Sequence, residues 1–300
     1  MPTTRTTTSP RAPAASKPLR GVRILSLALN IPGPAALMRL KAMGARCNKV
    51  EPPSGDPLGL YQRGAYETLH QGIKVSCADL RLAAGQKAVH RQLARADVLL
   101  TSFRPSALRK LGMDWATLRK AYPRLCQIDI VGSRGDRAEE PGHDLTYMAE
   151  HGLVNGLDLP PSLFADMGGS LMAVEAVLGA LLRQRVTGKG SHAQVSLGEA
   201  AGYLGLPRSW GLTTPTGAVG GAHAGYRVYA CKDGRVAVAA LEPHFALALC
   251  AAAGIETVDR TTMMANGTHE VIAQFLARQT RRKLEALAAK RDIPLFTLAA

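Results

Sequence analysis

The 300-residue sequence lacks the short motifs that mark the commonest nucleotide and metal sites. Its five cysteines are scattered, form no CxxC pair and are odd in number, which argues against a zinc site and a disulfide scaffold and predicts no metal centre. They also favour a reducing compartment, so we expect a cytoplasmic protein. There is no GxGxxG turn and no P-loop, so nothing predicts bound NAD or a nucleoside triphosphate.

Long apolar runs and acidic residues are scarce as well. No segment reads as the roughly 20 apolar residues of a membrane span, and we therefore expect a soluble protein without a membrane partner. The 37 basic residues outnumber the 23 acidic ones, and the net charge of +14 favours an anionic partner. Because aromatic residues make up only 5% and no nucleic-acid-binding motif occurs, we expect no nucleic acid. A phosphate-bearing small molecule and plain solubility both fit the charge.

The composition divides the chain into four parts. Residues 1–20 carry four basic residues, no acidic ones and many Thr, Ser, Pro and Ala, which predicts a disordered basic tail. A stretch rich in Gly, Thr and Pro predicts a linker over 207–225. The expected domains are a large one over 21–206 and a small one over 226–300, and a chain of this length can bury a core in both.

Alternating strand and helix patterns predict the fold class. Residues 22–27 form a β-rich run, 35–43 have helix-forming composition, and 47–51 read as a second strand, which together make a βαβ unit. The same alternation continues through expected helices at 82–94 and 115–121 and expected strands at 97–100, 125–131 and 192–197. We therefore expect an α/β fold whose large, Rossmann-like domain has a parallel sheet.

The small domain is predicted to be of the α+β type. An Asp233-Gly234 turn signal lies between the runs 226–231 and 235–240, which predicts a hairpin. Helical patterns follow at 243–253 and 269–290.

The stretch between Pro141 and Ser170 contains the residues most suited to chemistry. His143 titrates near neutrality, and the Asp166 carboxylate can take the opposite role if its environment separates the two pKa values. The glycines that follow Asp166 open an expected helix, and we expect the backbone amides of Met167 to Ser170 to face a developing oxyanion. A surface histidine beside an ordinary helix cap fits the same pattern.

Several motifs, in order and spacing, resemble the family III CoA-transferases and the α-methylacyl-CoA racemases that share their fold. The resemblance covers about residues 20–298. It rests on these segments: Gly21-Val22-Arg23-Ile24-Leu25, Pro32-Gly33-Pro34, Lys49-Val50-Glu51-Pro52-Pro53, Phe103-Arg104-Pro105, Ala165-Asp166-Met167-Gly168-Gly169, Thr187-Gly188-Lys189-Gly190 and Ala230-Cys231-Lys232-Asp233-Gly234. It implies the family III CoA-transferase fold, here short at its C-terminus.

The resemblance also assigns catalytic roles. Asp166 matches the essential aspartate, which is a nucleophile in the transferases and a base in the racemases. His143 matches the second base of the racemases, and Glu242 matches the glutamate that orients it. This set favours a 2-methylacyl-CoA racemase or epimerase with two-base proton transfer at the thioester α-carbon. A transferase with Asp166 as acyl-accepting nucleophile is the alternative. Because family members run past the position of Ala300, a catalytically silent CoA-binding homologue is a third reading.

The ligand and partner expectations come from the same resemblance. It implies an acyl-CoA as substrate, no tightly bound cofactor, and a homodimer whose subunits interlock. Arg104 matches a phosphate-contacting position, and Ala78, Asp79, Leu80 and Arg81 match the stretch along the adenine. The residues expected around the thioester are Asp144, Gly168 and Gly169.

Overall fold

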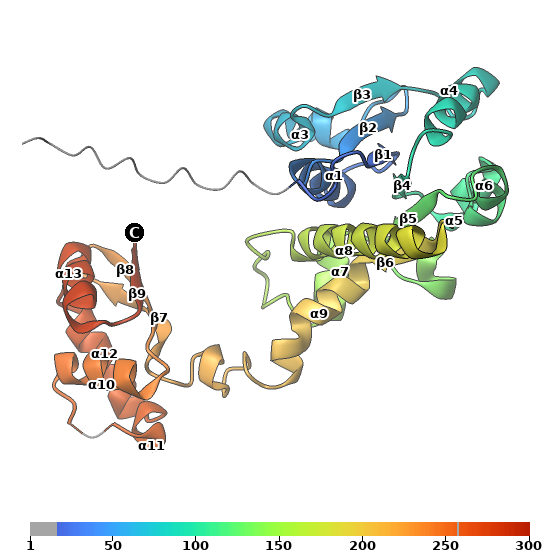
Figure 1. Cartoon of the computed structure of the whole chain (residues 1–300). Coiled ribbons are helices and arrows are strands. Elements are labelled where there is room, and N and C mark those ends of the chain that lie inside the picture. The colour runs from blue at the N-terminus through green and yellow to red at the C-terminus, as the bar shows by residue number, and fades with distance from the viewer. Residues whose placement is uncertain (1–16, 257) are drawn as a thin grey trace, which may run out of the picture. The chain divides into compact units, whose positions relative to one another are not determined.

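The computed structural model describes residues 17–256 and 258–300, and the chain divides into two compact units (Figure 1). Unit 1 extends to Leu204 and unit 2 runs from Gly205 to Ala300. The division falls inside one helix, α9 (Leu197–Ser209). Each unit has its own hydrophobic core.

Unit 1 is built on a six-stranded parallel sheet with the order β3-β2-β1-β4-β5-β6. Its strands are β1 (Arg23–Ser26), β2 (Arg46–Glu51), β3 (Lys74–Cys77), β4 (Val98–Thr101), β5 (Cys126–Val131) and β6 (His192–Ser196). Its helices are α1 (Pro32–Ala42), α2 (Pro57–Tyr61), α3 (Arg63–His70), α4 (Ala83–Leu93), α5 (Pro105–Lys110), α6 (Trp115–Ala121), α7 (Asp144–Glu150), α8 (Phe164–Thr187) and α9, with a 3-10 turn η1 (Gly135–Glu139). The predicted α/β class with a parallel sheet is confirmed.

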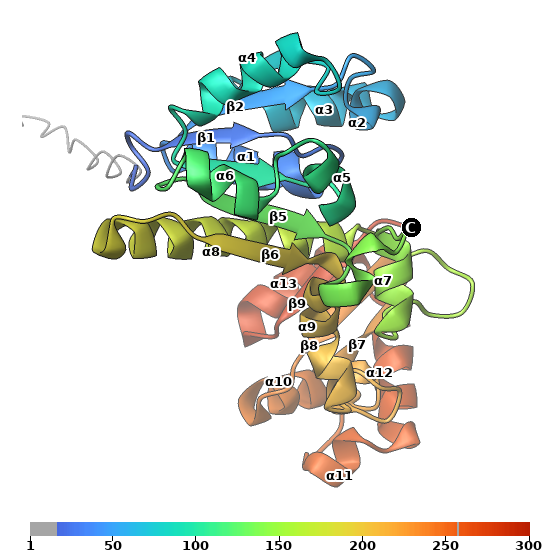
Figure 2. The same ribbon diagram turned by 90° about the vertical axis from the view of Figure 1, so that its right-hand side faces the viewer.

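Both faces of this sheet are covered, which explains the nearly continuous apolar strands. Val98 and Leu100 of β4 pack with α1 and α8, whereas Leu99 points to the other face and packs with α4, α5 and α6. Two prolines begin α1, in the turn where no backbone donor is needed. Figure 2 shows α8 running alongside β5 and β6, which it contacts.

Helix α8 differs from one sequence expectation. By length and composition alone it is the one helix among residues 17–256 and 258–300 that could cross a membrane, with a mean hydropathy of 1.4. Of the 18-residue stretch of α8 that has this hydropathy, 44% is buried within the protein. The buried apolar side chains of α8 pack against α1 and the sheet, so the core accounts for this part of the helix.

Unit 2 is an antiparallel sheet of order β7-β8-β9 covered by helices. Its elements are a 3-10 turn η2 (Ala218–Gly220), β7 (Tyr226–Cys231), β8 (Gly234–Ala239), α10 (Pro243–Ala253), α11 (Arg260–Met263), α12 (Asn266–Ala277), α13 (Arg281–Arg291) and β9 (Leu295–Leu298). The expected single helix over 269–290 is wrong, because Thr280 caps α13 by accepting the Lys283 N–H and separates it from α12.

The predicted disordered tail over 1–20 is wrong at its last residues, 17–20. Residues 1–16 lie outside the described residues, but 17–20 form an ordered turn. Leu19 is buried in the core of unit 1, and its N–H donates to the Met43 carbonyl at 3.0 Å. One apolar side chain thus anchors a segment whose composition reads as disordered.

Candidate functional site

The candidate site lies at the carboxyl ends of the parallel strands, where the sheet order reverses between β1 and β4. Open α/β sheets bind ligands at this switch point because the loops that leave the two strands diverge there. Leu29 and Asn30 follow β1, and Ser102 and Phe103 follow β4. All four line a cavity of about 200 Å³.

Asp166 and His143, which are 23 positions apart in the sequence, line this same cavity. Asp166 lies in the first turn of α8 and is half-buried. Burial and, to a smaller extent, the nearby charge of Asp144 together raise its pKa to about 7. The carboxyl group is therefore close to half-protonated at neutral pH and can both accept and return a proton.

His143 immediately precedes α7 as its N-cap residue. Its backbone N–H donates to the Thr146 Oγ1 at 3.1 Å, which fixes the start of the helix. The residue is exposed. The structure thus brings together two of the three predicted catalytic residues.

Asp144, which is expected beside the thioester, contacts Asp166. It is 5% exposed and accepts the Asp166 N–H on Oδ1 at 2.9 Å, so it holds the first turn of α8 in place. Because its charge lies beside Asp166, it also helps to keep that carboxyl protonated. Asp144 therefore acts on the candidate base directly.

Gly168 and Gly169 serve helix packing. A Cβ on Gly169 would lie 2.3 Å from Leu197 Cδ2, and one on Gly168 would lie 3.1 Å from Leu204 Cδ1, so both glycines let α9 approach α8. The predicted oxyanion role of the amides from Met167 to Ser170 is wrong. The Met167 N–H donates to the Leu163 carbonyl at 3.0 Å, and the next amides lie within α8, where they bond one turn back.

Two tyrosines that the sequence analysis did not select belong to this region. The Tyr147 hydroxyl occupies the space beside Gly132 and Gly142, where added Cβ atoms would lie 2.1 and 2.4 Å from it. Burial and the charge of Asp166 raise the pKa of Tyr147. Burial and the charges of Asp56 and Asp166 raise the pKa of Tyr61, at the end of α2. Their only sequence signal is an aromatic residue in a chain that has few.

The predicted CoA-binding residues occupy two cavities that share Phe103 as a wall. Arg104 lines the smaller cavity with Asp166. Residues 78–81 line a second cavity of about 400 Å³. There the Arg81 Nη2 and the Asp79 Oδ2 are 2.8 Å apart, and hydrogen bonds from Arg81 lower the pKa of Asp79 to about 2.

Glu242, the third predicted catalytic residue, belongs to unit 2. It is the N-cap residue of α10, which begins at Pro243. Its pairing with His143 stays a prediction.

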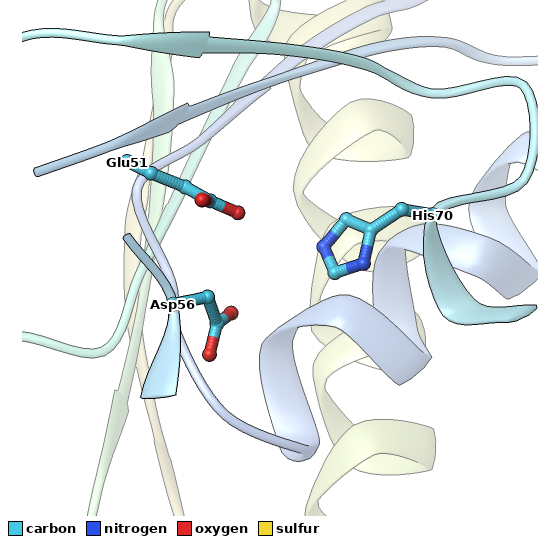
Figure 3. A group of neighbouring side chains, drawn as sticks. All are labelled: Glu51, Asp56 and His70. Carbon is cyan, nitrogen blue, oxygen red and sulfur yellow. The ribbon is translucent and has the colours of Figure 1, made fainter. Parts of the chain in front are cut away.

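A buried polar cluster beside β2 was also missed. Glu51, Asp56 and His70 offer ligand atoms that lie within 4.8 Å of one another, a set that could hold a metal ion (Figure 3). The Lys49 ammonium contacts all three, so the cation that they surround is part of the chain. In the sequence, the signal for this cluster was Lys49, a charged residue inside a predicted strand of a sheet that has both faces covered.

Comparisons with known proteins identify the family of this chain. The profile of CoA-transferase family III matches residues 19–299. The chain is 33% identical over 208 residues to cinnamoyl-CoA:phenyllactate CoA-transferase of Clostridium sporogenes, covering 62% of this chain and 50% of that one. It is 30% identical over 289 residues to alpha-methylacyl-CoA racemase of Mus musculus, covering 89% and 73%. The crystal structure of a CAIB/BAIF family protein from Brucella suis superposes with a TM-score of 0.78 at 25% identity, covering 95% and 85%. The chain spans about half the length of the first relatives that it matches, 50% and 52%.

Proposed function

Because the chain belongs to CoA-transferase family III, we propose that it is an acyl-CoA racemase or epimerase that moves the α-proton of a 2-methylacyl thioester between His143 and Asp166. One observation carries this proposal. The two residues line a single cavity, in which burial raises the pKa of the Asp166 carboxyl to about 7.

An Asp166 pKa of about 7 suits a reaction that must run in both directions. In one direction the Asp166 carboxylate removes the α-proton, and the His143 imidazolium returns a proton to the other face of the enolate. In the reverse direction the neutral imidazole removes the proton and the Asp166 carboxylic acid supplies one. Both protonation states of Asp166 are well populated near pH 7, as the two directions require.

The enolate oxygen needs hydrogen-bond donors other than the backbone amides of Met167 to Ser170, because those amides are bonded within α8. The backbone amides of Asp144 and Leu145 precede the first intrahelical bond of α7, which runs from Thr146 N–H to the His143 carbonyl. These two amides follow His143 directly, and we assign the oxyanion to them.

The CoA moiety extends from this cavity toward residues 78–81, past Phe103. Arg104 contributes a positive charge at the junction, where it meets the phosphates. The thioester is a substrate, and the reaction needs no tightly bound cofactor.

A CoA transfer reaction is the second candidate, supported by the similarity to the Clostridium sporogenes transferase. In that reaction the ionised Asp166 attacks the thioester carbonyl, and the C–S bond breaks. CoA departs as the thiolate, and the acyl group stays on Asp166 as a mixed anhydride. A carboxylate raised to a pKa of about 7 is only partly ionised at neutral pH, which favours proton transfer as its task.

The test is α-proton exchange in D₂O with a pure enantiomer of a 2-methylacyl-CoA, run beside an assay for CoA transfer to an added carboxylic acid. A racemase incorporates deuterium and forms the other enantiomer without an added acid. Transfer without exchange supports the alternative. Binding of CoA with neither reaction identifies a silent homologue.

A further inference from the structure

The cluster around Lys49 is a closed set of hydrogen bonds. Lys49 is 0% exposed. Its ammonium pairs with Asp56 Oδ2, lies 3.1 Å from Glu51 Oε1 and lies 2.9 Å from His70 Nε2. Two hydrogen bonds, to Asp56 and His70, and an ion pair with Glu51 thus compensate the buried ammonium.

His70 completes the set as a neutral acceptor. Its Nδ1 lies 2.6 Å from the Tyr66 carbonyl oxygen, which can only accept, so Nδ1 carries the proton and Nε2 offers its lone pair to Lys49. Burial lowers the pKa of His70 and keeps it neutral. The Tyr66 hydroxyl donates to Glu51 Oε1 at 2.9 Å.

Asp56 connects this cluster to the candidate site. Its second oxygen, Oδ1, accepts the Leu58 N–H at 3.0 Å, which caps α2, and the Asn30 N–H at 3.0 Å. Asn30 has a φ of 63°, a left-handed conformation that asparagine tolerates better than most residues but that still benefits from support by its surroundings.

Asn30 lies in the turn between β1 and α1 that lines the Asp166 cavity. The neighbouring Leu29 N–H donates to Ser102 Oγ at 3.1 Å, so the turn is tied to β4 on one side and to Asp56 on the other. If the Asn30 N–H lost its hydrogen bond to Asp56, the part of the turn around Asn30 could move.

We propose that the buried Lys49–Asp56 ion pair is a positioning device for the reaction, which holds the Asn30 turn as a wall of the cavity around Asp166. Lys49 fixes the Asp56 carboxylate by charge, and the carboxylate fixes the turn. This inference rests on the proposed function for its catalytic consequence, whereas the mechanical link rests on the contacts alone.

The test compares Asp56→Ser with Asp114→Ser. Asp114 is a matched control, because it caps α6 by accepting the Thr117 N–H and lies outside both cavities. Serine keeps helix-capping ability at both positions, but at position 56 it is too short to hold Asn30 and Lys49 together. Three quantities are measured: exchange of the Asn30 amide by NMR, the pKa of Asp166 from its carboxyl ¹³C shift, and kcat and KM for the acyl-CoA.

Asp56→Ser is expected to speed Asn30 exchange at least about tenfold and to lower the pKa of Asp166 from about 7, because water enters through the loosened wall. It should reduce kcat about tenfold and change KM less than about threefold, because a misplaced catalytic group slows the chemical step more than it weakens substrate binding. Asp114→Ser should leave all three quantities at their wild-type values.

Unchanged Asn30 exchange or an unchanged Asp166 pKa in Asp56→Ser would overturn the inference, and so would equal effects in the control. If Asp56→Ser does not fold, Asp56→Asn provides the same readouts, because it retains an oxygen for Asn30 but loses the ion pair. A wild-type protein without turnover would refute the proposed function, while the exchange and pKa readouts would still decide the mechanical link.

Discussion

At the scale of single residues, the Asp166 carboxyl links stability to pH. Its pKa of about 7 in the folded protein lies above the ordinary value of 3.8, so the folded state binds this proton more tightly than the unfolded chain. The resulting stabilisation is complete below about pH 4 and is lost as the pH rises through about 7.

Replacing Asp166 by Asn removes the buried charge. We expect Asp166→Asn to raise the free energy of unfolding by about 2 kcal/mol near pH 8, after allowance for solvent screening, and to change it little near pH 4. Urea unfolding at the two pH values measures this, with the exposed Asp136→Asn as control. The same increment at both pH values would contradict the assigned pKa.

Arg104 gives a second prediction at this scale. Truncation in Arg104→Ala should weaken CoA binding about tenfold at low salt, because the guanidinium makes a charge-assisted contact with phosphate. The loss should shrink as salt is added. Calorimetric titration at two ionic strengths provides the measurement, and equal affinity of wild type and variant would remove Arg104 from the CoA site.

At the scale of elements, two of the three glycines of α8, Gly169 and Gly179, have opposite surroundings. A Cβ on Gly169 would lie 2.3 Å from Leu197 Cδ2, whereas one on Gly179 would have nothing within 4 Å. Gly169→Ala should lower the free energy of unfolding by about 1–3 kcal/mol through overpacking against α9. Gly179→Ala should raise it by about 0.5–1 kcal/mol through helix propensity. Denaturant midpoints of the pair measure both effects, and a stabilised Gly169→Ala would show that α9 does not pack as described.

The element scale also shows what local sequence can predict. The apolar runs at 97–100 and 125–131 correspond to β4 and β5, and the helix expected at 115–121 matches α6 in its bounds, because burial and helix capping are local signals. Strand β3 was missed because it lies at the sheet edge, where Lys74 and Ser76 interrupt the apolar pattern. Strand β9 was missed because Leu295 and Phe296 pair with a strand some sixty positions earlier, a long-range contact.

The residues of the candidate site also divide into those with a local sequence signal and those that depend on long-range contacts. Asp166 and His143 could be selected because their motifs are local and resemble a family. The contacts of the two Asp56 oxygens could not be predicted. Oδ1 accepts from Asn30, which is 26 positions earlier, and Oδ2 pairs with Lys49, which only the fold brings within reach. The packing role of Gly169 was hidden for the same reason, since Leu197 belongs to another helix.

At the scale of the whole molecule, the family leads us to propose a homodimer. Sedimentation equilibrium at micromolar concentration should give twice the monomer mass, and the mass should not depend on salt if apolar surface forms most of the interface. A monomeric mass at that concentration would contradict the dimer and leave the site within one chain.

The central claim is that His143 and Asp166 are bases that act on opposite faces of one α-carbon. The most direct measurement is deuterium incorporation in D₂O into each enantiomer of a 2-methylacyl-CoA, supplied separately to wild type, His143→Ala and Asp166→Ala. The account predicts exchange of both enantiomers by wild type, exchange of one enantiomer without inversion by His143→Ala, and exchange of the other by Asp166→Ala. Full turnover of both enantiomers by His143→Ala would contradict it.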